Sequence, residues 1–124
     1  MPDKKILTLC IEDKCPSWNT IYAGIHWAKR KQMVDIIHEL VQWEVYQTRN
    51  KPKLPFKQAK ISAVIYFKGN KRHDIDNLCL KPYIDGLVHA EVIKDDNYKV
   101  IPELNIKLIN NSNKNIVKLE LIEI

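Results

Sequence analysis

The sequence lacks any long apolar run. No segment approaches the roughly 18 consecutive apolar residues that a membrane-spanning helix needs. The first residues, 1–5, are followed by the pattern of a strand and not by the apolar segment of a signal peptide. We therefore expect a cytoplasmic protein that does not enter a membrane.

Cysteine and histidine are sparse, and neither occurs at the spacing of a metal site. The cysteines are Cys10, Cys15 and Cys79, an odd number without a C-x-x-C pair. Such a set predicts neither a disulfide framework nor a zinc ribbon, so we expect reduced, mostly packed thiols. The 4 histidines also lack ligand spacing, and each is expected to be solvated or packed in the core.

Internal repeats, linkers and low-complexity segments are absent as well. With 124 residues, of which 45% are hydrophobic, the chain is long enough for one small core. We therefore expect a single domain over residues 1–124, carrying one site.

The periodicity of apolar residues predicts strands at both ends of the chain and a long helix between them. Alternation predicts a strand over residues 6–11, and residues 16–19 then have the composition of a loop. Spacings of three and four predict an amphipathic helix over about 27–47. Residues 60–67 are rich in β-branched and aromatic types, which predicts a largely buried strand.

The second half continues with a shorter helix and two more strands. The helix is expected to start near Asp76 and Asn77, which are suitable capping residues. Alternation over 104–108 and 117–121, around a polar turn at 110–115, predicts a terminal hairpin. The order of elements indicates an α+β fold: a single domain with a mixed β-sheet of about four strands and helices covering one face.

Charge is unevenly distributed. The formal net charge is +5 and the pI is about 9.1, which favours a polyanionic partner. Acid is concentrated between residues 74 and 96, whereas basic clusters occupy 29–31, 49–53, 57–60 and 68–72. The sequence thus indicates a basic protein around an acidic pocket.

The acidic stretch contains two pairs of aspartates. Asp74 and Asp76 project the same way if the backbone is extended, because side chains repeat with a period of two. Asp95 and Asp96 follow about twenty residues later, the length of a helix and a return loop, so a third carboxylate can come back beside the first two. A D-x-D pattern alone is common on surfaces, but this combination predicts a site for a hard divalent cation such as Mg2+.

The same segment resembles the RusA-like family of Holliday-junction resolvases. That family is marked by D-x-D-N, a lysine, D-G-L or D-A-L, and an acidic pair before a strand. This chain has Asp74-Ile75-Asp76-Asn77, Lys81, Asp85-Gly86-Leu87 and Asp95-Asp96 in that order, and Pro16-Ser17-Trp18-Asn19 resembles the family's P-S-x-N loop. The resemblance is close over residues 72–98 and weak elsewhere.

The resemblance implies a homodimer that makes paired symmetric nicks in four-way junctions. The cofactor would be Mg2+, with Mn2+ as a substitute. Asp74, Asp76, Asp96 and Lys81 would be the catalytic residues, and Asp95 would join the three aspartates as a metal ligand.

Lys81 lies one residue further from Asp76 than the lysine of the better-known members, and Pro82 follows it. On a regular helix one extra residue turns a side chain by about 100°. Pro82 favours a bulge or a late helix start, which would return Lys81 to the site.

Contacts with DNA are expected from residues around the acidic pocket and from the start of the long helix. Cations near a helix N-terminus are disfavoured by the helix dipole, so an external anion would account for residues 29–31, although an ordinary solvated face is the alternative. His73 stands where relatives often have arginine, and Arg72 is expected to hold phosphate in its place. The expected DNA-binding residues are Arg72, Lys71, His73, Asn77, Asn19, Lys29, Arg30 and Lys31.

The function expected from the sequence is therefore a magnesium-dependent, structure-specific endodeoxyribonuclease acting on Holliday junctions. Two alternatives stay open: a non-catalytic branched-DNA-binding protein with the same fold, and a nuclease for flaps or forks. Nucleotide-sugar transferases and aspartyl-phosphate phosphatases also use D-x-D, but the chain is short for the former, and Phe67 is too far from Asp74 for the latter.

Overall fold

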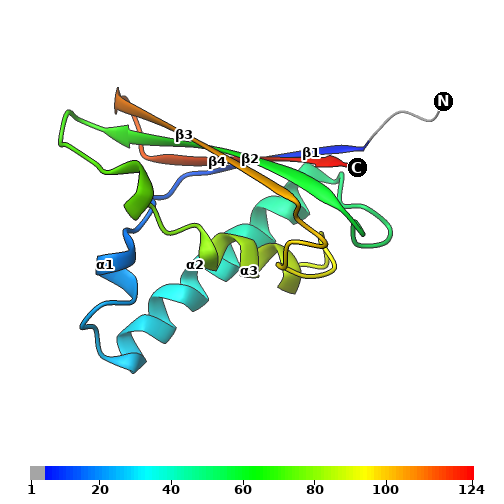
Figure 1. The fold of residues 1–124 in the computed structure, drawn as a ribbon, viewed down its shortest axis with the longest axis horizontal. Helices are drawn as coiled ribbons and strands as arrows, with labels where there is room; N and C mark the ends of the chain where they lie inside the picture. The colour runs from blue at the N-terminus through cyan, green and yellow to red at the C-terminus, as the bar shows by residue number, and fades with distance from the viewer. Residues whose placement is uncertain (1–4) are drawn as a thin grey trace.

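The computed structural model describes residues 5–124, in which all helices lie on one side of a single sheet (Figure 1). The elements along the chain are β1 (Ile6–Ile11), α1 (Trp18–Ile21), α2 (Trp27–Thr48), β2 (Ala59–Lys68), the 3-10 helix η1 (Ile75–Asn77), α3 (Lys81–His89), β3 (Glu103–Ser112) and β4 (Ile116–Glu123). The expected α+β domain with a four-stranded mixed sheet is confirmed.

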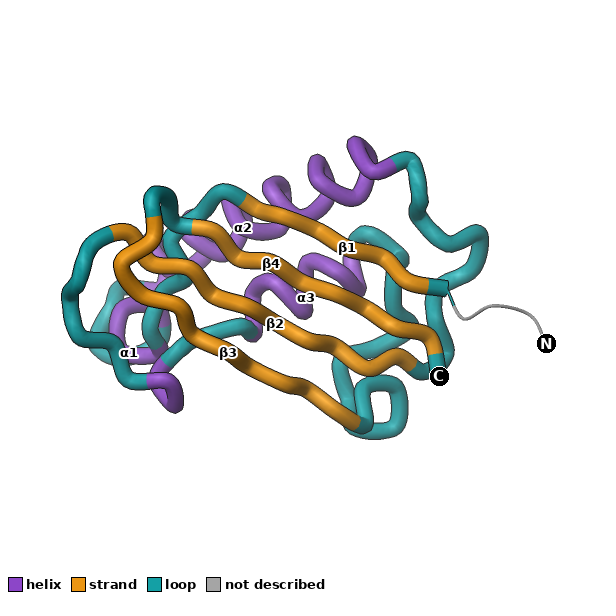
Figure 2. Tube along the Cα trace, turned by 90° about the horizontal axis from the view of Figure 1, so that it is seen from above, coloured by secondary structure: helices purple, strands orange, loops and turns teal. Residues whose placement is uncertain are grey.

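The strand order is β1-β4-β2-β3 (Figure 2), and it corrects the prediction of a terminal hairpin. β4 runs antiparallel to both β1 and β2, whereas β3 pairs only with β2 and runs parallel to it. β2 therefore separates the two strands that were expected to pair. The reason is the crossover through α3, which returns the chain to the open edge of β2 as a βαβ unit.

The core lies between the sheet and the helices. Alternate residues of β1, β2 and β4 point toward the helices and are buried, as the period of two requires. From α2, Ile37, Val41 and Val45 project into the same layer at helical spacing. The other face of the sheet carries half-buried and exposed side chains, and Figure 2 shows it uncovered by helices.

The long helix agrees with the sequence prediction to within one residue at its end. α2 begins after His26, whose Nδ1 accepts a hydrogen bond from the backbone N–H of Ala28 at 3.2 Å. It ends at Thr48, and the capping residue Arg49 adopts the left-handed conformation with φ of 52°. A polar cap and a left-handed residue are the usual ways to begin and end a helix.

The shorter helix starts later than expected. Asp76 and Asn77 do not cap α3; they belong to η1, and α3 begins at Lys81. The cause is Pro82, which has no N–H to donate inside a helix and is tolerated only in the first turn. The late start that Pro82 was expected to produce is confirmed.

The segment expected as a loop at residues 16–19 instead contains the start of α1. Ser17 supplies the reason, because its Oγ accepts a hydrogen bond from the backbone N–H of Thr20 at 3.0 Å and caps the short helix. Within residues 5–124, none of the helices has the length and apolar character that crossing a membrane would require.

Candidate functional site

Three of the predicted site residues line one pocket. Asp76 comes from η1, Lys81 from the first turn of α3, and Asp96 from the loop before β3. This pocket, called the carboxylate pocket below, has a volume of about 350 Å³. Its other lining residues are mostly apolar: Trp18, Ile75, Leu78, Leu80, Ile84, Leu104 and Ile106.

Lys81 lies within ion-pairing distance of two carboxylates, one of which, Asp96, lines this pocket. Its Nζ lies 3.9 Å from Oδ2 of Asp96 and 3.7 Å from Oδ2 of Asp85, one helical turn further along α3. The Lys81 side chain is 49% exposed and that of Asp85 only 27%, so the group is partly shielded from water. The late start of α3 thus brings Lys81 to the carboxylates of Asp96 and Asp85.

Asp74 and Asp76 line different pockets. Asp74 is extended and precedes η1, so the regular alternation that would aim both carboxylates at one point is interrupted after Asp74. Asp74 lines a neighbouring pocket of about 440 Å³, called the basic pocket below. Leu78 is shared between the two pockets, so they are adjacent.

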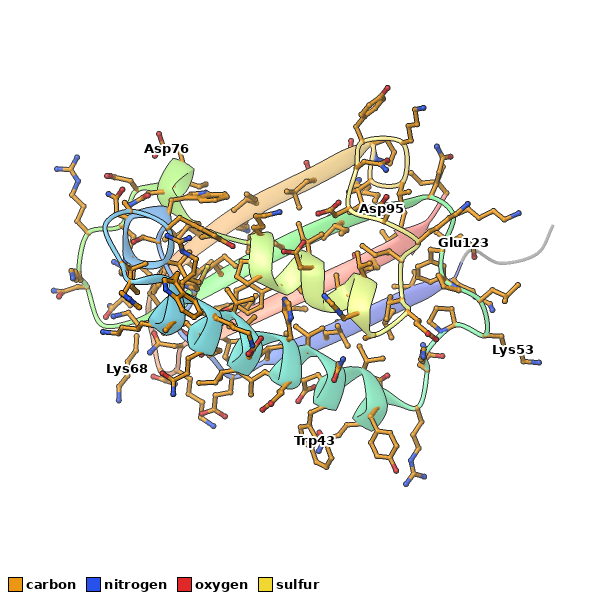
Figure 3. All side chains as sticks on the ribbon, turned by 90° about the horizontal axis from the view of Figure 1, so that it is seen from below. Trp43, Lys53, Lys68, Asp76, Asp95 and Glu123 are labelled. Atoms are coloured by element: carbon orange, nitrogen blue, oxygen red, sulfur yellow. The ribbon has the colours of Figure 1, made fainter. Side chains whose placement is uncertain are left out.

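The carboxylate of Asp95 accepts hydrogen bonds from its own loop. Its Oδ1 accepts a hydrogen bond from the backbone N–H of Asp96 at 2.8 Å, and its Oδ2 accepts one from Nδ2 of Asn97 at 3.1 Å. Figure 3 shows Asp95 on the loop before β3, away from Asp76 on η1. These bonds fix the turn that presents Asp96 to Lys81.

The basic pocket contains half of the eight residues expected to contact DNA. Lys71, Arg72, His73 and Asn77 all line it, together with Asp74. Lys14, which the sequence reasoning did not single out, lines it too. The only sequence signal for a role of Lys14 was its position just before the P-S-x-N motif. Asn19 is exposed on α1 between Trp18, which lines the carboxylate pocket, and Thr20, which lines the basic pocket.

His73 is held flat against the end of β2. Its ring stacks on Phe67 with centroids 3.7 Å apart and planes inclined by 11°. Partial burial lowers the pKa of His73, and the nearby Lys14 and Lys71 ammonium groups lower it further. The imidazole is therefore neutral at neutral pH.

The cluster at residues 29–31 has local partners for two of its three cations. Arg30 donates from Nε to the carbonyl of Ile21 at 3.1 Å and from Nη2 to that of Tyr22 at 3.3 Å, and so satisfies the end of α1. Lys31 pairs with Asp35 one turn along α2, with Nζ 2.7 Å from Oδ2. Lys29 is exposed on the first turn of α2.

The carboxylate pocket has two carboxylates that could hold a metal ion. Within residues 5–124, no three His, Cys, Asp or Glu side chains are grouped closely enough to hold a metal ion by themselves. Magnesium requires less, because it is commonly bound by one or two carboxylates while waters and substrate phosphates complete its shell. Asp76 and Asp96, which line the same pocket, meet that smaller requirement.

Two residues in or beside the carboxylate pocket were incompletely foreseen. Asp85 was noted only as part of a motif, although the i,i+4 spacing from Lys81 could have indicated the pair. Trp18 was noted only as part of the P-S-x-N motif; it is 40% exposed and lines the pocket.

Compared with models of known protein families and with curated proteins, the chain shows no match to either.

Proposed function

We propose that the protein is a magnesium-dependent endodeoxyribonuclease that nicks branched DNA, with Holliday junctions as its substrate in the cytoplasm. The observation that carries the proposal is the convergence of Asp76, Lys81 and Asp96 on one pocket from three separate segments. A structural ion pair would need only two of these groups. Two carboxylates and a lysine in one pocket are the set that phosphodiester hydrolysis uses.

The neighbouring basic pocket supports DNA as the substrate. Lys14, Lys71 and Arg72 line it beside the carboxylate pocket, so a strand whose phosphates bind these cations passes close to Asp76. Cationic contacts of this kind supply much of the affinity for nucleic acid and set its position. The carboxylate pocket would then cleave at a phosphate next to those bound in the basic pocket.

Five residues in or beside the carboxylate pocket would have separate roles in this reaction. Asp76 and Asp96 would hold Mg2+, which supplies Lewis acidity toward the phosphodiester when bound. Lys81, beside Asp96, places positive charge where the phosphate gains negative charge during attack. Asp85 contacts the same ammonium and keeps it from turning into solvent. Trp18 forms part of the apolar wall that limits water in the pocket.

The test is cleavage of a labelled synthetic four-way junction, compared with a fork, a flap and a linear duplex. We expect symmetric nicking of the junction in Mg2+ or Mn2+ and none in EDTA. Asp76→Asn should abolish nicking while binding in EDTA persists. The matched control is Asp35→Asn, which removes an exposed carboxylate of α2 whose ion-pair partner within residues 5–124 is Lys31.

The outcomes separate the alternatives. If the unmodified protein binds the junction but never cuts any substrate, a branched-DNA-binding protein is the better account. One observation favours that alternative: the carboxylates of Asp74 and Asp95 are directed to the basic pocket and to a loop, respectively, and not to the carboxylate pocket. Cutting of forks or flaps in preference to junctions would keep the nuclease and change its substrate.

A homodimer belongs to the same proposal. A four-way junction has approximate two-fold symmetry and requires two cuts, which a C2 dimer with one site per chain can make. Light scattering of the free protein should therefore give twice the chain mass of 14.6 kDa. A monomer that stays monomeric on the junction would rule out coordinated paired nicking by this geometry.

A further inference from the structure

The basic pocket has an apolar floor beneath its cationic rim. Phe67 and Cys15 are buried at 2% and 3% exposure, and Leu78 and Met33 also line the pocket. These residues come from β2, the loop after β1, the segment after η1 and α2, so the fold builds the floor from four separate places. A site for phosphate alone would not need an apolar floor of this kind.

A flat ring covers one part of this floor. His73 lies parallel to Phe67 at stacking distance, which immobilises the imidazole and makes it a platform for a further ring. Nucleobases bind to such surfaces by stacking, irrespective of sequence.

The rim carries cations that are free to bind phosphate. The Arg72 side chain is 94% exposed, and its nearest acidic partner, Asp74, is 3.9 Å away. Lys14 and Lys71 form no ion pair with any side chain of residues 5–124. The backbone carbonyl of Lys71 accepts a hydrogen bond from Nδ2 of Asn110 at 2.8 Å, which anchors this loop to β3.

We propose that the basic pocket binds a single unpaired nucleotide of the branched substrate, with its base stacked on His73 and its phosphates on Lys71 and Arg72. The volume of about 440 Å³ lies within the roughly 300–1,000 Å³ of small-ligand pockets. A base within a duplex has both faces covered by its neighbours, whereas a branch point supplies bases that can unstack. The pocket thereby gives the protein a means of choosing branched over linear DNA.

This inference rests on the proposed nuclease function but concerns binding, so it is tested without cleavage. We would place the fluorescent base 2-aminopurine at the branch of a four-way junction and, separately, within one arm, and titrate protein in EDTA. We expect the branch probe to change its emission on binding as its base restacks on His73, and the arm probe to remain unchanged. A short single-stranded oligonucleotide should compete for the pocket, and inorganic pyrophosphate should compete far less.

Variants of His73 separate stacking from charge. His73→Ala should weaken junction binding by about tenfold and remove the emission change, because stacking supplies a large part of the affinity of such sites. His73→Phe should restore both, since it keeps a flat ring on Phe67. His89→Ala is the matched control, because this exposed histidine lies at the end of α3 and stacks with His38.

Several results would overturn the inference. Unchanged affinity of His73→Ala would do so, and so would pyrophosphate competing as well as the oligonucleotide, which would reduce the pocket to a phosphate site. Failure of the two proposals can be told apart. A junction that is nicked although the branch probe never responds would overturn the nucleotide pocket alone, whereas a branch probe that responds on a junction never nicked would overturn the nuclease alone.

Discussion

At the scale of the residue, Lys81 determines how charge is arranged in the carboxylate pocket. Its ammonium contacts Asp96 and Asp85, so it reduces carboxylate repulsion and adds positive charge for a phosphate. We expect Lys81→Met to lower the nicking rate at saturating junction by about a hundredfold, as loss of a transition-state contact does. Single-turnover kinetics in Mg2+ measure the rate.

Junction affinity in EDTA provides the control for Lys81→Met. It should stay unchanged, because the cations that bind the DNA backbone lie in the basic pocket. Lys94→Met, on the exposed part of the loop before β3, should leave both rate and affinity at the wild-type level. An equal loss of rate and affinity in Lys81→Met would show that Lys81 only holds DNA.

The thiols give a second prediction at this scale. Burial raises the pKa of Cys15 to about 12 and that of Cys79 to about 11, from 9.0, whereas Cys10 is exposed. Because both folded-state pKa values are raised, the associated stability is complete below pH 9.0 and is lost as the pH rises through about 11 and 12. A chromogenic disulfide reagent at about pH 8 should modify only Cys10 in the folded protein.

Denaturant should then expose the two remaining thiols to the reagent. Rapid native modification of Cys15 or Cys79 would contradict their placement in the core. The variant Cys10→Ser is the control. It should abolish the rapid modification of the folded protein and leave the modification of Cys15 and Cys79 in denaturant unaffected.

At the scale of the element, Gly86 sets how closely α3 approaches α2. A Cβ built at Gly86 would lie 3.1 Å from both Cβ and Cγ2 of Val41. Gly86→Ala should gain up to about 1 kcal/mol in helix propensity and lose roughly 1–3 kcal/mol to overpacking, so the net effect is destabilising. The free energy of unfolding in urea measures it.

A second substitution at this helix contact separates the two contributions to the Gly86→Ala effect. In a Val41→Ala background the contacts with Cγ1 and Cγ2 are removed and only the contact with Cβ remains, so the cost of Gly86→Ala should be smaller than in the unmodified protein. If Gly86→Ala stabilises the unmodified protein instead, the contact between α2 and α3 is looser than the structure has it.

Local patterns predicted the elements well and their pairing poorly. Period-two alternation and helical spacing are properties of neighbouring residues, so β1, α2 and β2 could be placed from the sequence. The pairing of β3 with β2 depends on where α3 returns the chain, and the polar residues at 110–115 gave a competing local signal for a hairpin. Asn115 illustrates the outcome: its Oδ1 accepts the backbone N–H of Lys68 at 2.8 Å, so the turn caps β2.

The same division holds for the candidate site. The charged residues of the carboxylate pocket lie in one motif-bearing stretch, and Asp76, Lys81 and Asp96 were predicted from it. The floor of the basic pocket is built from distant segments, and Phe67 or Met33 carries no local mark of that role, since an apolar residue at either position also fits an ordinary core.

At the scale of the whole molecule, basic side chains outnumber acidic ones, and the two kinds are concentrated in different pockets. This distribution determines how DNA binding responds to salt. The chain has 20 Lys and Arg against 15 Asp and Glu. Junction binding in EDTA should weaken steeply with salt, because each neutralised phosphate contributes about 0.9 to the slope of log affinity against log salt concentration.

Single lysine substitutions locate this electrostatic surface. Lys71→Ala, in the basic pocket, should reduce the salt slope by about 0.9 and weaken binding at low salt. Lys53→Ala is the matched control: Figure 3 shows Lys53 at the opposite end of the molecule from Asp76, so its removal should leave the slope unchanged. Equal slopes for both variants would mean that charge acts only through the molecule's overall field. A reduced slope for Lys53→Ala alone would place the DNA away from both pockets, and the proposed path of the strand would have to be abandoned.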